Sequence, residues 1–135
     1  MKITLCGSTR FAEHFNNWNA GLTLAGHLVY SVAMFGRTSH DVGKPEQNLQ
    51  VSDEEKVALD LIHLGKIEAS DAIVVLNVND YVGESTLREI AWARMRSKEV
   101  FFLERRGPSV WQVYATNGQP LLSSPAKRFL GQYAG

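Results

Sequence analysis

Short apolar runs alternate along the chain with longer segments of helical periodicity. Lys2 to Cys6 (KITLC) is apolar and β-branched, which predicts a buried strand that ends at Gly7. The next segment predicts a helix that Gly26 ends. Its large apolar residues recur at helical spacing and are expected in the core: Phe11, Phe15, Trp18 and Leu22.

Two further strand and helix signals follow in the first half. His27 to Phe35 is predicted to be the second strand. Gly36 to Val51 is polar and lacks a clear period, and a loop of this length in a compact domain is usually functional or disordered. Ser52 and Glu55 have the spacing of a capping box, which predicts the start of the next helix.

The second half repeats the alternation. Asp71 to Asn77 is almost entirely apolar, as in a central parallel strand covered on both faces. A helix is predicted to end near Lys98, and Glu99 to Glu104 is predicted to be a strand. The segment from 109 to 117 (SVWQVYATN) is predicted to be a short helix. The whole pattern predicts one domain, residues 1–135, with an open, doubly wound parallel sheet.

In such sheets ligands bind outside the carboxyl ends of the strands. This rule selects three polar, Gly-rich junctions: the segment CGSTR after the first strand, the loop after Phe35, and the segment NVNDYVGEST after the third.

Composition narrows the classes of partner. The formal net charge is zero and the pI is about 6.9, which argues against polymeric nucleic acid and membrane surfaces as partners. Cys6 is the single cysteine, so an intrachain disulfide and a cysteine-cluster metal site are excluded, and a buried thiol in a reducing compartment is expected. No run has the length of a membrane span, and a cytoplasmic protein is predicted.

The junction from Gly7 to Arg10 (GSTR) allows two interpretations. Backbone amides at a helix start bind anions, and Ser8, Thr9 and Arg10 add hydroxyl and guanidinium donors. Alternatively, Ser8 or Thr9 is simply the N-cap of the helix.

The segment GESTLRE is equally open. Thr86 followed by Glu89 has capping-box spacing, in which case Glu89 bonds only the backbone. In the functional interpretation Glu89 is held ionised at the positive helix end and acts as a nucleophile or stabilises an oxocarbenium ion. Asp80 and Glu84 are the other carboxylates that could share these roles.

Histidine positions do not suggest a metal site. His63 lies one turn from Asp60 on a predicted helix, and a lone helical histidine is most often structural. His14, His27 and His40 show no ligand spacing. Neither a metal nor a cofactor is therefore expected.

Four segments in order resemble the nucleoside 2-deoxyribosyltransferase superfamily, over residues 2 to about 104: LCGSTRF, HLGKIEASDAIVVLN, YVGESTLREIAWA and KEVFFLE. The resemblance implies a flavodoxin-like or Rossmann-like three-layer α/β sandwich. It also implies cleavage of the bond between a nucleobase and C1′ of a ribose or deoxyribose.

The resemblance assigns roles to individual residues. Glu89 matches the nucleophile of the Glu-[Leu/Ile]-Gly-x-Ala signature, although Ala91 replaces its glycine. His63 stands where many members carry an aspartate that assists base protonation, and Asp60 could substitute for it. The implied substrate-binding residues, which include those for a 5′-phosphate and the sugar, are Cys6, Gly7, Ser8, Thr9, Arg10, Asp80, Gly83, Ser85 and Thr86.

Two function classes follow. The first is an N-glycosidase or 2-deoxyribosyltransferase acting on a small nucleoside or nucleoside 5′-monophosphate. The alternative is a non-catalytic nucleotide-binding module. Because family members usually assemble, a homodimer or higher homo-oligomer is expected, with a neighbour completing the site.

Overall fold

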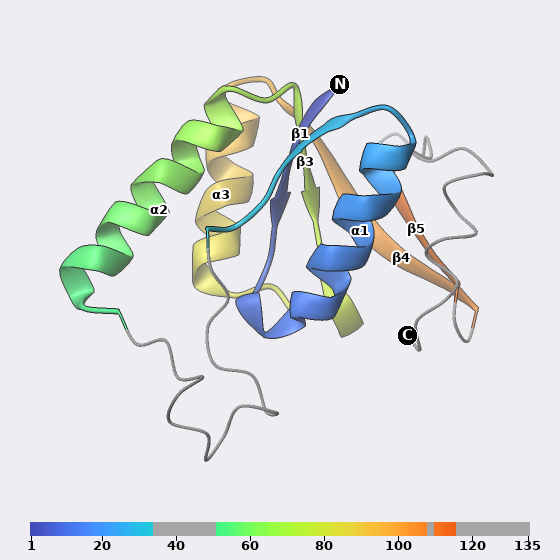
Figure 1. Cartoon of the computed structure of the whole chain (residues 1–135), viewed down its shortest axis with the longest axis horizontal. Coiled ribbons are helices and arrows are strands. Elements are labelled where there is room, and N and C mark those ends of the chain that lie inside the picture. The colour runs from blue at the N-terminus through green and yellow to red at the C-terminus, as the bar shows by residue number, and fades with distance from the viewer. Residues whose placement is uncertain (34–50, 108–109, 116–135) are drawn as a thin grey trace, which may run out of the picture.

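The computed structural model describes residues 1–33, 51–107 and 110–115, and side-chain positions are described outside residues 105–114 (Figure 1). The helices and strands alternate along the chain. In order they are β1 (Lys2–Cys6), the 3₁₀ turn η1 (Thr9–Phe11), α1 (Ala12–Leu24), β2 (Leu28–Tyr30), α2 (Asp53–Glu68), β3 (Ala72–Val75), the 3₁₀ turn η3 (Val78–Asp80), α3 (Glu84–Met95), β4 (Glu99–Gly107) and β5 (Val110–Ala115).

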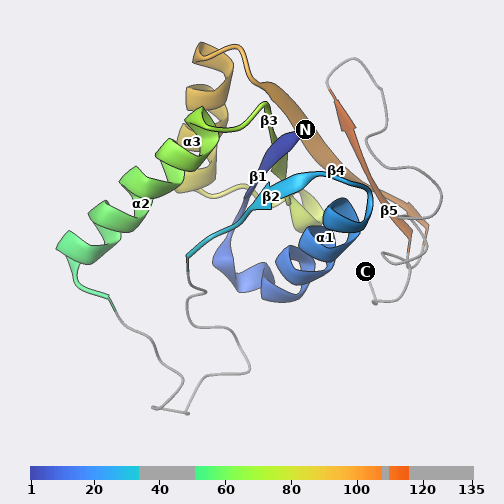
Figure 2. The same cartoon turned by 45° about the horizontal axis from the view of Figure 1, so that its top comes forward.

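The sheet has the strand order β2-β1-β3-β4-β5 (Figure 2). Strands β2, β1, β3 and β4 are parallel, and β5 runs antiparallel to β4. Ile3 pairs with Ala72 and Cys6 with Val75, so the two central strands end side by side. The predicted open, parallel α/β sheet is confirmed, and β5 extends its edge.

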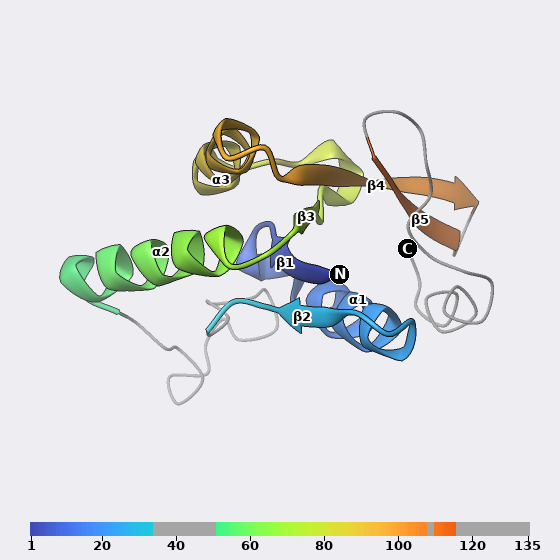
Figure 3. The same cartoon turned by 90° about the horizontal axis from the view of Figure 1, so that it is seen from above.

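Helices cover both faces of the sheet (Figure 3). On one face α1 packs Phe15, Trp18 and Leu22 against the strands. On the other face Ile67 of α2 and Ile90 of α3 pack against Cys6, Ile73, Val75 and Val100. Both faces of β3 are thus buried, as its apolar sequence predicts, and the three-layer sandwich is confirmed.

Two helix ends have the predicted caps. The amides of Gly26 and His27 donate to the carbonyls of Thr23 and Leu22, both at about 3 Å, and Gly26 has φ +95°. This pair of hydrogen bonds is a Schellman motif, which ends α1 just before the glycine. At the start of α2, the amide of Glu55 donates to Ser52 Oγ and the amide of Ser52 donates to Glu55 Oε1. The predicted capping box is confirmed.

Two element predictions are corrected. The second strand is only Leu28–Tyr30, shorter than predicted, and its expected end at Phe35 and the 36–50 loop lie outside the described residues. The predicted helix at 109–117 is wrong, because Val110–Ala115 forms strand β5. Its sequence, VWQVYA, is rich in β-branched and aromatic residues, which favour a strand at the free edge of β4.

No helix in the described part of the chain combines the length and the apolar character needed to cross a membrane.

Gly7 lies where the backbone leaves little room for a side chain. It has φ +153°, and a Cβ placed on it would lie 3.1 Å from the Leu76 carbonyl oxygen. We predict that Gly7→Ala lowers the free energy of unfolding by about 1–3 kcal/mol, because the backbone and Leu76 would both have to shift. Urea denaturation measures this change.

Gly65→Ala is the matched control. Gly65 lies inside α2, and a Cβ there would meet nothing within 4 Å. The same substitution should therefore raise the unfolding free energy by about 0.5–1 kcal/mol, through helix propensity. Equal effects at both sites would contradict the proposed crowding at Gly7.

Candidate functional site

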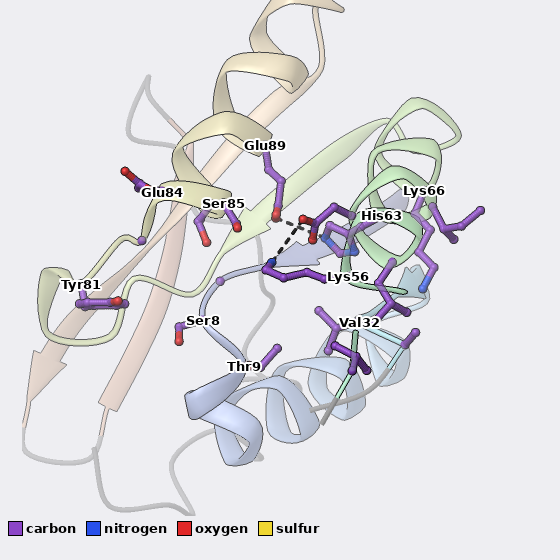
Figure 4. Close-up of a pocket in the computed structure, with 18 residues that line it drawn as sticks. Ser8, Thr9, Val32, Lys56, His63, Lys66, Tyr81, Glu84, Ser85 and Glu89 are labelled. Carbon is purple, nitrogen blue, oxygen red and sulfur yellow. Dashed lines mark hydrogen bonds and ion pairs between the residues drawn. The ribbon is translucent and has the colours of Figure 1, made fainter. Parts of the chain in front are cut away.

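A pocket of about 610 Å³ lies at the carboxyl ends of β1 and β3 (Figure 4). This is the point where the chain departs to opposite faces of the sheet, through α1 after β1 and through α3 after β3. The pocket is lined by Gly7, Ser8, Thr9, Val32, Ala33, Val51, Lys56, Leu59, Asp60, Ile62, His63, Lys66, Tyr81, Gly83, Glu84, Ser85, Thr86 and Glu89.

Glu89 and His63 meet at one end of this pocket. Glu89 extends from α3 and His63 from α2, and Figure 4 shows them pointing toward each other. The Glu89 Oε1 and His63 Nε2 atoms are 3.4 Å apart, and their side chains are only 14% and 10% exposed. The carboxyl group therefore faces the pocket from a largely dry position.

Cys6 lies behind this pair. Its Sγ is 3.6 Å from His63 Nε2, and the residue is fully buried at the end of β1. Burial, together with the adjacent Glu89 carboxylate, raises the pKa of the Cys6 thiol well above its usual range. The thiol is consequently protonated at neutral pH and can donate a hydrogen bond to Glu89.

Burial shifts the pKa values of Glu89 and His63 in opposite directions. Desolvation raises the pKa of Glu89 to about 7, with Asp60 adding to the rise while Cys6 and nearby cations oppose it. Desolvation lowers the pKa of His63 to about 4, assisted by Lys66. His63 is therefore neutral near pH 7, and its contact with Glu89 is not an ion pair.

The second predicted capping box is wrong. Helix α3 begins at Glu84, with Gly83 as an N-cap that makes no side-chain bond. Thr86 is thus the third helical residue and is buried, and Glu89 lies in the second turn. The helix dipole acts mainly within the first turn, so the expectation that it keeps Glu89 ionised is also corrected.

The GSTR junction has the N-cap geometry. Ser8 caps η1, its Oγ accepting from the Arg10 amide at 3.4 Å. The Arg10 guanidinium lies 4.3 Å from the centre of the Tyr81 ring and donates to the Tyr81 hydroxyl at 3.2 Å. Arg10 is consequently absent from the pocket lining, while Ser8 and Thr9 belong to it.

The remaining predicted site residues divide into two groups. Gly7, Gly83, Ser85 and Thr86 line the pocket, and so does Asp60. Two others do not belong to the lining: Cys6, which lies beneath it, and Asp80, which has φ +62° in η3.

Sequence reasoning missed three polar groups of the pocket: Lys56, Lys66 and Tyr81. Lys56 Nζ is 3.3 Å from Asp60 Oδ2, and Lys66 Nζ donates to the Ser31 carbonyl at 2.7 Å. The spacing of Lys56, Asp60 and His63 places them on one helix face, which is a signal that could have found Lys56. Tyr81 depends on the turn η3, whose left-handed backbone at Asn79 the sequence does not indicate.

The fold is shared with enzymes of known structure. A 2-deoxyribosyltransferase from the psychrotolerant bacterium Bacillus psychrosaccharolyticus matches with a TM-score of 0.54 and 20% identity, over 76% of this chain and 71% of that one. At this identity the likeness establishes the fold, and it confirms the fold that the sequence resemblance implies.

A second solved structure is a weaker match. The CMP N-glycosidase BcmB of Clostridium botulinum has a TM-score of 0.47 and 17% identity, over 76% of this chain and 67% of that one. No protein-family model and no curated protein matches the chain.

The raised pKa of Glu89 has a consequence for stability. A carboxyl group that is harder to ionise in the folded state contributes stability below its unfolded pKa of 4.5, and this contribution is lost as the pH rises through about 7. We predict that Glu89→Gln makes the protein more stable at pH 8, by up to about 3 kcal/mol, with the advantage vanishing near pH 4. Chemical denaturation across this range measures the difference.

Glu84→Gln serves as the control, because it removes an exposed carboxylate from the same helix. It should change the unfolding free energy by less than about 1 kcal/mol. If Glu89→Gln and wild type have equal stability at pH 8, Glu89 is not buried as described.

Proposed function

We propose that this chain belongs to the nucleoside 2-deoxyribosyltransferase superfamily and cleaves, or transfers, the N-glycosidic bond of a nucleoside or nucleoside 5′-monophosphate. The observation that carries the proposal is the placement of Glu89. Its carboxyl group faces a pocket at the switch point of the sheet, from the helix where the family signature expects the nucleophile. The fold shared with a 2-deoxyribosyltransferase supports this proposal.

In the proposed reaction ionised Glu89 attacks C1′ of the sugar. The C1′–N bond breaks, its electron pair leaves with the base, and an ester forms between Glu89 and C1′. The departing base takes up a proton from solvent. Water or a second base then displaces Glu89 from C1′, loses a proton to solvent and restores the carboxylate. Hydrolysis and transfer differ only in this second step.

His63 acts as a positioning residue in this scheme. Its neutral ring contacts Glu89 through Nε2 and is itself packed between Cys6 and the helix α2. The ring limits the space open to the carboxyl group without adding a charge. At a pKa of about 4 the ring carries too little proton at neutral pH to act as the acid for the base.

Polar groups along the pocket suit the rest of a nucleotide. Ser8, Thr9 and Ser85 offer hydroxyl groups, and the amides in the first turn of α3 are free of a side-chain cap. Lys56 and Asp60 offer a donor and an acceptor on the opposite wall. We assign the sugar and any 5′-phosphate to the hydroxyl side, and the base to the wall formed by α2.

The central test is release of free base. We predict that the wild-type chain releases base from at least one member of a panel of ribo- and deoxynucleosides and their 5′-monophosphates. Glu89→Gln should lower kcat by at least about 10³-fold, because the amide cannot form the ester. Chromatographic detection of the free base measures the rate.

Glu84→Gln, on the same helix and also in the pocket lining, is the control and should retain most of the rate. Unchanged turnover in Glu89→Gln would remove Glu89 as the nucleophile. Tight binding of one nucleotide with no turnover would support the alternative, a non-catalytic nucleotide-binding module.

A homo-oligomer is also part of the proposal. Helix α2 exposes Val57, Leu61 and Ile62 at about 60% each among the described residues, and Figure 1 shows its N-terminal half projecting beyond α3. Ile62 also lines the pocket, so a neighbour packed on this face would help to enclose the site.

We predict that sedimentation velocity detects a dimer or higher assembly, and that Leu61→Glu shifts it toward the monomer, since a buried charge opposes association. Leu87→Glu is the control, because Leu87 is similarly exposed on α3 but lies outside the α2 face. A wild-type monomer at micromolar concentration would contradict this part of the proposal.

A further inference from the structure

Three potential metal ligands converge at the end of the pocket. Cys6 Sγ, His63 Nε2 and a Glu89 carboxylate oxygen all lie within 4.8 Å of one another. They come from β1, α2 and α3, and 57 residues separate Cys6 from His63 in the chain. The sequence spacing therefore gives no indication of this set, and the expectation of no metal rested on the histidine spacing and on the single cysteine.

We infer that Cys6, His63 and Glu89 form a binding site for Zn²⁺, and that the bound ion suppresses the proposed glycosidic reaction by occupying Glu89. The second half of this inference rests on the proposed function, whereas the first half does not.

Two of the three separations between the ligand atoms fit a tetrahedral zinc ion, and the third, from Cys6 Sγ to Glu89, is within 4.8 Å. Bonds of about 2.3 Å to sulfur and about 2.1 Å to nitrogen and oxygen place a sulfur and a nitrogen ligand about 3.6 Å apart, and a nitrogen and an oxygen ligand about 3.4 Å apart. The observed distances are 3.6 Å from Cys6 to His63 and 3.4 Å from His63 to Glu89. These two pairs need little movement to bind an ion, and rotation of the Glu89 side chain sets its separation from Cys6.

The surroundings of His63 match those of a metal-bound histidine. The ring also hydrogen-bonds the backbone of Leu5. Because Nε2 faces Cys6 and Glu89, the hydrogen bond to the Leu5 backbone is made by Nδ1–H. The Nε2 lone pair is then available to bind a cation. A backbone carbonyl on the second ring nitrogen is the usual partner of a zinc-bound histidine.

The donor set selects the kind of metal. One thiolate, one imidazole and one carboxylate suit zinc, whereas Mg²⁺ and Ca²⁺ prefer oxygen ligands throughout. Binding displaces the proton of the Cys6 thiol, and that of Glu89 where it is protonated, into solvent. The two anionic ligands then balance the charge of the ion.

The fourth position of the ion opens toward the pocket. His63 and Glu89 belong to the pocket lining, while Cys6 lies beneath it, so the pocket is the path of entry. Three protein ligands and one open position allow a water or a substrate atom to complete the tetrahedron. Zinc bound in this way holds the carboxylate oxygen that the proposed reaction needs at C1′.

Metal binding to the chelator-treated chain of residues 1–135 tests the site directly. Competition with a chromophoric zinc chelator should give one Zn²⁺ per chain, and Mg²⁺ should not compete. Cobalt(II) in place of zinc should give a thiolate-to-cobalt charge-transfer band. Cys6→Ser and Glu89→Gln should each weaken zinc binding by about 100-fold or more, and Cys6→Ser should abolish the band.

Asp60→Asn is the matched control, because it changes a pocket carboxylate outside the trio. Asp60 acts on the trio only through its charge, so this variant should weaken zinc binding by less than about 10-fold. Circular dichroism establishes that each variant is folded, and Glu89→Gln preserves the shape of the side chain. Absence of stoichiometric binding, or equal affinity in wild type and both ligand variants, overturns the site.

Inhibition is measured separately on any substrate that releases base. One equivalent of Zn²⁺ should reduce the rate at least about 10-fold, and a chelator should restore it. Zinc that binds without slowing base release overturns the inhibitory half. If no substrate releases base, the proposed function fails, and the binding measurement still decides whether the zinc site exists.

Discussion

The parallel pairing of β1 with β3 is the constraint on which the site depends. The Leu76 amide donates to the Cys6 carbonyl at 2.8 Å, which keeps the two strands in register to their last residues. Beyond this bond the chain leaves through α1 on one face and through α3 on the other. Two polar loops are thereby held side by side with no strand between them, and the crevice follows from this divergence.

The same pairing explains why the junctions are built from small residues. A side chain at Gly7 would press against Leu76, the residue that follows β3. Ser8 follows directly as the N-cap of η1, and it lines the pocket. Arg10 instead packs against the Tyr81 ring. The close approach of the two strand ends therefore determines which side chains reach the pocket.

Much of this arrangement was predictable from local sequence. The strands β1 and β3, the stop at Gly26 and the cap at Ser52 depend on neighbouring residues only, and each was correctly predicted. The rule that ligands bind at the carboxyl ends of parallel strands then placed Glu89 near the end of β1, although Glu89 and β1 are distant in sequence.

The features that the sequence did not predict correctly depend on tertiary packing. The start of α3 is three residues earlier than a Thr86 cap implies, because Gly83 supplies the extended backbone and Thr86 is buried. Strand β5 forms because β4 offers it a free edge. The sequence VWQVYA is compatible with a strand, but local sequence does not indicate that this edge is free. The contact between His63 and Cys6 depends on the angle at which α2 packs against β1. The spacing of residues along the chain does not predict that packing angle.

The replacement of an expected aspartate by His63 gives the site its particular electrostatics. A second buried carboxylate would repel Glu89, whereas a neutral imidazole neither repels it nor supplies a charge to ionise it. The pKa of Glu89 is consequently raised mainly by burial, so a cation placed beside the carboxylate stabilises its ionised form. Positive charge that develops at C1′ in an oxocarbenium-like transition state meets this need, and so does a divalent metal ion. The proposed reaction and the proposed zinc site are thus two uses of one buried carboxylate, and they exclude each other because both require the same oxygen atoms.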